Sequence, residues 1–355
     1  MSAIEPSSYR WPAEWETHEA TWLSWPVNPN TWPGIFEQIP ADYARFVAAI
    51  ACFEPVRILT ANAAAADEAR RLTNEACEAA AAKFPVDFID IAVNDSWCRD
   101  YGPIFLNRRP EITSGDAQIM IDWDYNAWGG KYPPWDHDAQ VARKIAHLLN
   151  CPRISPGIIL EGGAIEGNGA GTVLTTENCL LNPNRNPDLN RLAMEGLLRR
   201  YLNCERVVWL PGHGIIGDDT DGHIDQVARF ADRLHVLVAA PHNDDAEEAT
   251  ALRANRDAVL GARTATGESL QVTDLKMPSP KFEQGHRLPA CYCNFYIVNG
   301  GVIVPTFRDA ADDEALVALQ AAFPDRRIVG VDALKLIWGL GAFHCMTQQQ
   351  PAIII

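Results

Sequence analysis

Apolar residues recur along the chain with helical and strand-like spacings in turn. Helical spacing is clearest in the alanine-rich run from Asn62 to Lys83, where Asp, Glu and Arg gather on one face. Four more helices are predicted, at 137–150, 188–203, 244–262 and 310–322. Short apolar runs between them predict strands at Val56–Thr60, Val86–Ile91, Ile119–Trp123, Ile158–Glu161, Val173–Thr175, Val207–Leu210, Leu234–Ala239, Phe295–Val298, Val302–Pro305 and Ile328–Val331. Because strands and helices interleave throughout, the pattern predicts an α/β fold.

The polar segments between these elements are short. No Pro/Gly/Ser-rich linker, block of like charges or low-complexity segment divides the sequence, so we expect one domain spanning 1–355. A group of a few strands with one helix recurs about five times, without a residue pattern strong enough to define a repeat. This recurrence suggests a radial arrangement of units and does not establish it.

Charge narrows the classes of partner. The formal net charge is −16, which argues against nucleic acid and anionic membranes because phosphate binding relies on clustered Lys and Arg. It would favour a cationic substrate, although an acidic surface can also serve solubility alone. No apolar run approaches the ~18 residues of a membrane span, and the opening MSAIEPSSYRWPAEW lacks a signal-peptide pattern. We therefore expect a cytoplasmic protein.

The nine cysteines lack the paired spacings of a disulfide framework or a zinc site. Cys291 and Cys293 form a C-x-C, but no second ligand pair lies at finger-like spacing. Alternation along a strand explains this pair better. We expect no structural metal here.

Two carboxylates adjoin glycine-containing turns. Asp100 lies just before a Gly-Pro break and is a candidate ligand for a cation; the alternatives are a turn cap or an ion pair with Arg99. Glu161 follows an apolar run and precedes Gly162-Gly163, which allow close approach of backbone or substrate. A glutamate that ends a strand is also often simply solvated.

Four acids surround one histidine in the segment Asp218–Asp225. In an extended segment His223 and Asp225 would point to the same face, which suits a base and a carboxylate that address one ligand. A calcium loop is the main alternative, but the EF-hand spacing and its terminal Glu are missing.

A glycine-containing loop precedes Cys345 near the C-terminus. Gly339 and Gly341 would allow a lid that leads into a nucleophilic thiol, although a cysteine before an apolar tail is often buried packing. His344 is the adjacent residue, and neighbours on a strand face opposite ways. His223 is therefore the better candidate for the base.

Taken together, these clusters resemble the agmatine deiminase branch of the bacterial-type peptidyl-arginine deiminase family. The resemblance extends from Trp11 to the final Gln-Gln-Gln-Pro, and it rests on the strings LEGGAIEGNGAGTVLTTENCLLNPNRNP, TDGHID, NFYIVNGGVIVP and HCMTQQQP. It implies the pentein fold, an α/β-propeller of five ββαβ units around a pseudo-fivefold axis, with the active site in the central channel. It also implies a homo-oligomer, a dimer or a tetramer.

The resemblance also implies roles for particular residues. Cys345 corresponds to the nucleophile, His223 to the acid/base, and Asp100 and Asp225 to the carboxylates that grip a guanidinium. Substrate-binding positions fall on Glu161, Asn294, Trp97, Asp219 and Gly341. The implied reaction hydrolyses agmatine to N-carbamoylputrescine and ammonia, a step of putrescine biosynthesis, through an S-alkylthiouronium on Cys345. It needs neither a metal nor an organic cofactor.

Two departures from the family pattern concern the tail of the substrate. Asp219 stands where relatives that act on agmatine commonly have Glu, and the loop from Gly339 to Phe343 replaces a run of glycines. Alternative functions are therefore a deiminase of another guanidino compound or of peptidyl-arginine, an amidinotransferase, and a guanidino-binding protein without turnover.

Overall fold

Six sheets hold the strands of the computed structural model, which describes residues 4–244 and 246–353. Five of these sheets contain a triplet of strands with one pairing order, an antiparallel pair followed by a parallel pair. The triplets are β5–β6–β7 (Ile104–Arg108, Gln118–Ile121, Arg153–Ile154), β8–β9–β10 (Ile165–Gly167, Thr172–Thr176, Arg206–Leu210), β11–β12–β13 (Ala228–Phe230, His235–Ala240, Gln271–Lys276), β16–β17–β18 (Tyr296–Val298, Gly301–Thr306, Arg327–Asp332) and β19–β2–β3 (Thr347–Pro351, His18–Ser24, Val56–Thr60). The other strands are β1 (Tyr9–Arg10), β4 (Val86–Asp90), β14 (Lys281–Glu283) and β15 (His286–Leu288).

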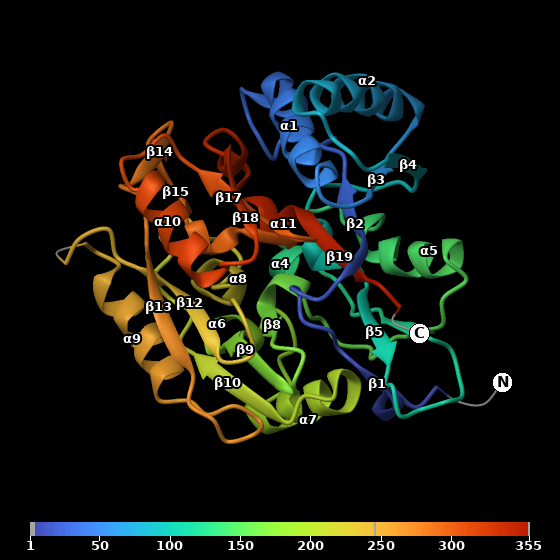
Figure 1. Ribbon diagram of the computed structural model, residues 1–355, viewed down its shortest axis with the longest axis vertical. Coiled ribbons are helices and arrows are strands. Elements are labelled where there is room, and N and C mark those ends of the chain that lie inside the picture. The colour runs from blue at the N-terminus through green and yellow to red at the C-terminus, as the bar shows by residue number, and fades with distance from the viewer. Residues whose placement is uncertain (1–3, 245, 354–355) are drawn as a thin grey trace.

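Helices connect the two parallel strands of every triplet, because a parallel pair needs a crossover connection. The crossover helices are α1 (Ile39–Ala51), α5 (Val141–Leu148), α7 (Arg191–Leu202), α9 (Ala249–Leu260) and α10 (Asp312–Ala322). A further helix, α2 (Ala63–Ala80), joins β3 to β4. Figure 1 shows α2, α5, α7 and α9 at the periphery of the molecule. Each triplet with its crossover is thus one ββαβ unit.

One unit is completed by both ends of the chain. The C-terminal strand β19 pairs antiparallel with β2, with Thr347 opposite Leu23, and the two strands lie side by side in Figure 1. The three successive glutamines of β19 are buried, so this strand is polar in sequence yet internal in position. It brings the C-terminal segment back against the N-terminal one.

The helices predicted from periodicity are confirmed as α2, α5, α7, α9 and α10. Residue 245, inside the range predicted at 244–262, lies outside the described residues, as do the ends 1–3 and 354–355 of the predicted domain. The capping of α2 is local: the Asn62 side chain accepts from the Ala65 N–H, and Ala81 ends the helix in a left-handed conformation. Among the described helices, none is long and apolar enough to cross a bilayer.

Two local predictions are wrong. Residues Ile158–Glu161 form only an isolated bridge between Ile159 and Asp124, because a 3-10 turn, η4 (Gly162–Ala164), follows at once. Cys291 and Cys293 do not alternate along a strand: Cys293 lies in η5 (Tyr292–Asn294), and Cys291 precedes this turn and caps it with its side chain. The other predicted strands correspond to observed ones.

Candidate active site

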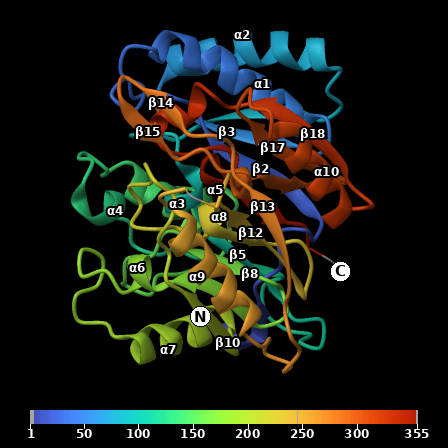
Figure 2. The same cartoon turned by 90° about the vertical axis from the view of Figure 1, so that its left-hand side faces the viewer.

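A short helical turn precedes the first strand of each triplet. These turns are α3 (Cys98–Tyr101), η4, α8 (Ile224–Val227), η5 and α11 (Phe343–Met346). They contact one another in cyclic order: α3 with η4, η4 with α8, α8 with η5, η5 with α11, and α11 with α3. Figure 2 shows α3 and α8 near the middle of the molecule. The ring therefore brings together segments that are far apart in the sequence.

Every turn carries or adjoins one of the residues predicted for the site. Asp100 lies in α3, Glu161 immediately before η4, Asp225 in α8, Asn294 in η5 and Cys345 in α11. The expected extended conformation of Asp218–Asp225 is wrong, because α8 begins directly after His223. The convergence on one site therefore arises from the ring of turns and not from strand alternation.

A cavity of about 530 Å³ opens beside the ring. This is within the range of ~300–1,000 Å³ that is usual for small-molecule sites. Five of the predicted residues line it: Trp97, Asp100, Asp219, Gly341 and Cys345. The other four, Glu161, His223, Asp225 and Asn294, are buried beside the cavity and are not among its lining residues.

Gly163 marks the point where three predicted residues meet. A Cβ at this position would lie 2.6 Å from His223 Nδ1, 2.8 Å from Asp100 Oδ1 and 3.1 Å from Asp225 Oδ2. Such separations are too short for a side chain, so the close approach requires glycine here. Its N–H donates to Asp100 Oδ1 at 3.0 Å, which fixes one oxygen of that carboxylate.

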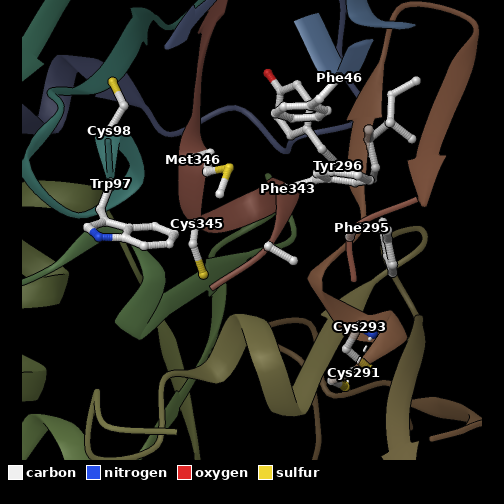
Figure 3. Close-up of a cluster of buried hydrophobic side chains, with 14 of the residues drawn as sticks. Phe46, Trp97, Cys98, Cys291, Cys293, Phe295, Tyr296, Phe343, Cys345 and Met346 are labelled. Carbon is white, nitrogen blue, oxygen red and sulfur yellow. Dashed lines mark hydrogen bonds between the residues drawn. The ribbon is translucent and has the colours of Figure 1, made fainter. Parts of the chain in front are cut away.

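Cys345 is held from two sides. Its Sγ lies 3.1 Å from Asn294 Nδ2 and 3.5 Å from Asp225 Oδ2. Figure 3 shows its sulfur beside the Trp97 ring, with Phe343 on the side of the turn that faces Phe46; the Phe343 and Phe46 rings stack at 4.2 Å. The Phe343 anchor thus leaves Cys345 free to face the cavity.

The electrostatics of the site favour the protonated form of the Cys345 thiol. Burial, together with the charges of Asp225 and Asp100, raises the pKa of Cys345 well above its ordinary value. Burial also raises the pKa of Asp100 to about 6, although the charge of His223 opposes this shift. A cation placed between the two carboxylates would lower the pKa of the thiol.

Asp100 has neither of the simpler roles considered from sequence. Its second oxygen, Oδ2, accepts from Trp128 Nε1 at 3.0 Å. Arg99 instead donates to Gln349 and lies near Glu14. Asp100 is therefore a buried carboxylate that two neutral donors hold in place.

His223 and Asp225 differ in their partners. Neither ring nitrogen of His223 has a hydrogen-bond partner among the described residues, and its Nδ1 lies 3.7 Å from Asp100 Oδ1. Burial alone would lower the pKa of His223, but Asp100, Cys179 and Glu161 outweigh it and raise that pKa well above the usual value. Asp225 accepts from His344 Nδ1 at 2.7 Å through Oδ2, while its Oδ1 has no partner within the described chain. The site thus holds the His223 imidazole, whose charged form is favoured, and Asp225 Oδ1, which has no hydrogen-bond partner among the described residues.

Glu161 and Asp219 are already engaged by the protein. Glu161 accepts from Arg185 Nε at 2.9 Å, and both side chains are fully buried. Asp219 accepts from the Tyr132 hydroxyl at the wall of the cavity. Glu161 is therefore part of an internal ion pair, whereas Asp219 can still face a ligand.

Two groups of side chains are close enough to share a metal ion. They are Glu161 with Cys179 and His223, and Glu14 with Glu166 and His344. Arginines already neutralise the carboxylates of both groups: Arg185 pairs with Glu161, and Arg229 pairs with Glu14 and Glu166. This positive charge disfavours a metal in either place.

A family model described as Porphyromonas-type peptidyl-arginine deiminase matches residues 10–351. The chain belongs to this family. The resemblance seen in the sequence motifs is thereby confirmed at the level of the family.

Within the Porphyromonas-type peptidyl-arginine deiminase family, an agmatine deiminase of Pseudomonas aeruginosa (strain LESB58) is 37% identical over 99% of this chain and 98% of its own length. The solved agmatine deiminase of Enterococcus faecalis, described as catalysing its reaction, matches with a TM-score of 0.89 and 32% identity over 100% and 99% of the two chains. A cysteine-to-serine variant of the C. jejuni agmatine deiminase with substrate bound matches with a TM-score of 0.86 and 28% identity over 98% and 97%.

Sequence reasoning missed several residues that shape the site of this family member. Trp128 holds Asp100 from a left-handed turn, at φ +56°, and Glu14 lies behind His344. His344 was set aside because a strand was assumed, whereas α11 is helical. The adjacent glycines in Asn126-Ala-Trp-Gly-Gly were the available signal for Trp128, since glycines favour left-handed backbone.

Proposed function

We propose that this chain is an agmatine deiminase that hydrolyses agmatine to N-carbamoylputrescine and ammonia. The observation that carries the proposal is a thiol, Cys345, beside two buried carboxylates, Asp100 and Asp225; one oxygen of Asp225 has no hydrogen-bond partner among the described residues. A guanidinium is planar and cationic, and it supplies several N–H donors to such oxygens. The names of the relatives support agmatine as the guanidinium compound.

In the first half-reaction, the Cys345 thiolate attacks the central carbon of the guanidinium. The carbon–sulfur bond forms, one carbon–nitrogen bond breaks, and His223 gives a proton to the departing nitrogen, which leaves as ammonia. The covalent product is an S-alkylthiouronium. Asp100 and Asp225 fix the plane of the cation so that the carbon lies before the sulfur.

In the second half-reaction, water attacks the thiouronium carbon. His223 takes one proton of the water, the second proton passes to solvent as the ureido carbonyl forms, and the carbon–sulfur bond breaks to regenerate the thiolate. His223 suits both steps because it is buried 3.7 Å from Asp100 Oδ1, whose charge favours the proton-donating imidazolium. The covalent route divides one difficult hydrolysis into two displacements.

Binding of the substrate prepares the nucleophile. Asp225 and Asp100 contribute to the raised pKa of the Cys345 thiol, so a cation that neutralises them removes part of that shift. The thiolate would then form mainly in the presence of substrate. This limits reaction of the thiol with other electrophiles.

The residues that line the cavity would bind the part of the substrate beyond the guanidinium. We propose that Asp219 receives the distal amine of agmatine, while Trp97, Trp128 and Tyr132 surround its aliphatic chain. Leu340, in the loop that replaces a run of glycines, lines the cavity together with Trp338, which precedes that loop. A short, slender guanidino-amine fits these walls better than a peptide does.

Ammonia release from a substrate panel tests the proposal. The panel contains agmatine, arginine, a blocked arginine peptide, and guanidino-amines one methylene shorter or longer than agmatine. We expect the highest kcat/KM for agmatine. Release from the arginine peptide alone would favour the peptidyl-arginine function, and binding of agmatine without release would favour a binding protein.

We also propose that the five units close around a pseudo-fivefold axis as a pentein propeller, within one domain. The cyclic contacts of the turns and the shared pairing order of the triplets support this arrangement. Solved proteins of the same family match over nearly the whole chain. An experimental structure whose triplets do not surround a common axis would refute it.

The family resemblance and the charge of −16 support three further proposals: a cytoplasmic protein, a dimeric or tetrameric homo-oligomer, and no nucleic-acid or membrane partner. Light scattering on purified protein tests the assembly state. A mass equal to one chain at micromolar concentration would contradict the oligomer.

A further inference from the structure

His344, the neighbour of the candidate nucleophile, lies between two carboxylates. Its Nδ1 is 2.7 Å from Asp225 Oδ2 and its Nε2 is 2.8 Å from Glu14 Oε2, and the residue is 1% exposed. An ionised carboxylate can only accept hydrogen bonds, so both ring nitrogens must donate. An imidazole that donates through both nitrogens is the charged imidazolium.

The contact decides which oxygen of Asp225 is left for a ligand. Oδ2 faces both His344 Nδ1 and the Cys345 sulfur, at 2.7 and 3.5 Å. Oδ1 is buried and has no hydrogen-bond partner among the described residues. The side chain is thus held by one oxygen, and the other stays available.

Glu14 anchors the far end of this bridge. Its Oε1 accepts from the Ile297 N–H at 2.8 Å, and its Oε2 lies 2.8 Å from Arg229 Nη2 and 3.6 Å from Arg99 Nη2. These contacts fix the glutamate although it is buried, and the charges of Arg229, His344 and Arg99 hold its pKa well below the ordinary value against the effect of burial. The Glu14 carboxylate is therefore a fixed anion on the Nε2 side of His344.

We propose that His344 is a positioning residue, which keeps Asp225 ionised, holds it by Oδ2 and so leaves Oδ1 for the substrate, and which Glu14 holds in place. This inference rests on the proposed function, because it assigns the free oxygen to a guanidinium. His344 itself touches neither the substrate nor the reacting carbon. The direction of the Asp225 pKa agrees: burial would raise it, but the hydrogen bond and charge of His344, with His223 and Arg229, lower it.

Other groups also face this pair of side chains. The titratable and charged residues on the surrounding elements are Asp100 and Arg99 of α3, His223 before α8, Arg229 of β11, Glu166 of β8, Cys293 of η5, Cys345 of α11 and Glu14. Two of the closest cations, Arg229 and His223, remain when His344 is replaced. The loss of His344 should therefore shift the titration of Asp225 without abolishing its ionisation.

The test is the pH dependence of ammonia release by His344→Gln. Glutamine keeps a hydrogen-bond donor but carries no charge, so Asp225 should take up a proton at a higher pH than in the wild type. We expect the loss of kcat/KM relative to the wild type to be about 10-fold at pH 5.5, mainly through KM, and to shrink several-fold by pH 8.5. A deficit that is equal at both pH values would overturn the proposal.

A second variant and a matched control separate positioning from folding. Glu14→Gln leaves His344 in place but removes the rear anion, so its pH profile should shift in the same direction by less. His242→Gln is the control, because His242 also lies beside a buried carboxylate, Glu248 Oε1 at 3.3 Å, and contacts none of the proposed catalytic or positioning groups. It should leave the acidic limb unmoved; an equal shift in His242→Gln would also overturn the proposal.

Nitrogen NMR of the histidine rings gives a readout that does not depend on turnover. In wild-type protein at pH 7, both ring nitrogens of His344 should carry protons, and the assignment comes from the resonance lost in His344→Gln. A neutral His344 tautomer would refute the bridge even if agmatine is hydrolysed. Wild-type protein that releases no ammonia, with a doubly protonated His344, would refute the proposed function instead and leave the bridge.

Discussion

The inner ring of turns and the outer layer of helices bury their side chains in different ways. The turns are three or four residues long and bury Asp100, Asp225, Asn294 and His344. Helix α2, by contrast, is 18 residues long and buries only small or apolar faces such as Ala69. A turn of four residues is far below the ~12–15 residues at which a helix is marginally stable alone. The ring is therefore held by its neighbours.

The ring of turns carries the proposed catalytic residues, whereas the outer helices contribute mainly to the stability of the fold. Each turn is fixed by hydrogen bonds to another turn, as with Gly163 to Asp100 and Asn294 to the Cys345 N–H. The outer helices are fixed by apolar contact, and α2 and α7 also by the side-chain caps of Asn62 and Asn190. Substitutions in the ring should alter turnover first, and substitutions in the outer layer should alter the free energy of unfolding first.

Removing the thiol should give the largest effect. Cys345→Ala should reduce ammonia release from agmatine at least ~10⁴-fold, because no covalent intermediate can form, while agmatine still binds the carboxylates. Isothermal titration and an ammonia assay measure the two quantities. The outer-layer control is Cys77→Ala in α2, which should keep wild-type kcat; comparable turnover in the two variants would remove Cys345 as nucleophile.

Neutralising one carboxylate of the site should give the second-largest loss of activity. Asp100→Asn leaves a guanidinium without one of its two buried anions, and breaking such a pair costs roughly 3–5 kcal/mol in kcat/KM. Both KM and kcat should change, because Asp100 fixes the cation before and during attack. Asp87→Asn in β4 is an exposed control that should leave both constants unchanged. If Asp100→Asn kept the wild-type kcat/KM, Asp100 would not be one of the carboxylates that bind the guanidinium.

The ring should also set the acidic limb of the pH profile. Asp100 must be ionised to bind a cation, and burial raises its pKa to about 6. Its protonated form predominates below that value, so kcat/KM should fall about tenfold for each pH unit below 6. Initial rates at low agmatine concentration between pH 4.5 and 8 measure this. A profile that stays flat down to pH 4.5 would mean that Asp100 is not the group that limits binding.

The two layers also differ in how much the sequence predicted. Periodicity located α2, α5, α7, α9 and α10, because an amphipathic helix on a sheet repeats its apolar positions over several turns. It missed α1, whose 13 residues are mostly buried on all sides. It also missed β19, in which buried glutamines replace the usual apolar positions. In β19, burial by tertiary contact leaves no apolar alternation along the strand.

Motifs and the family resemblance predicted which residues form the site. They did not predict how the ring of turns joins these residues or where His344 points. Asp100, His223, Asp225 and Cys345 could be nominated because each lies in a distinctive string, but the ring that joins them depends on long-range contacts. His344 was rejected on an assumed strand, although the four-residue turn α11 directs it toward Asp225. A turn this short carries no periodicity, so its side-chain directions cannot be predicted locally.

The smallest expected effect belongs to the outer layer alone. The Asn62 side chain caps α2 by accepting from the Ala65 N–H at 3.0 Å, and Asn62→Ala should lower the free energy of unfolding by about 1 kcal/mol. Urea denaturation measures the loss, and kcat/KM should stay at the wild-type value because α2 packs mainly on α1, β3 and β4. Asn74→Ala is the matched control: this exposed mid-helix residue should lose no stability, since alanine favours helix. If Asn62→Ala lowered turnover per folded molecule, the separation between a ring that performs the chemistry and a layer that supports it would fail.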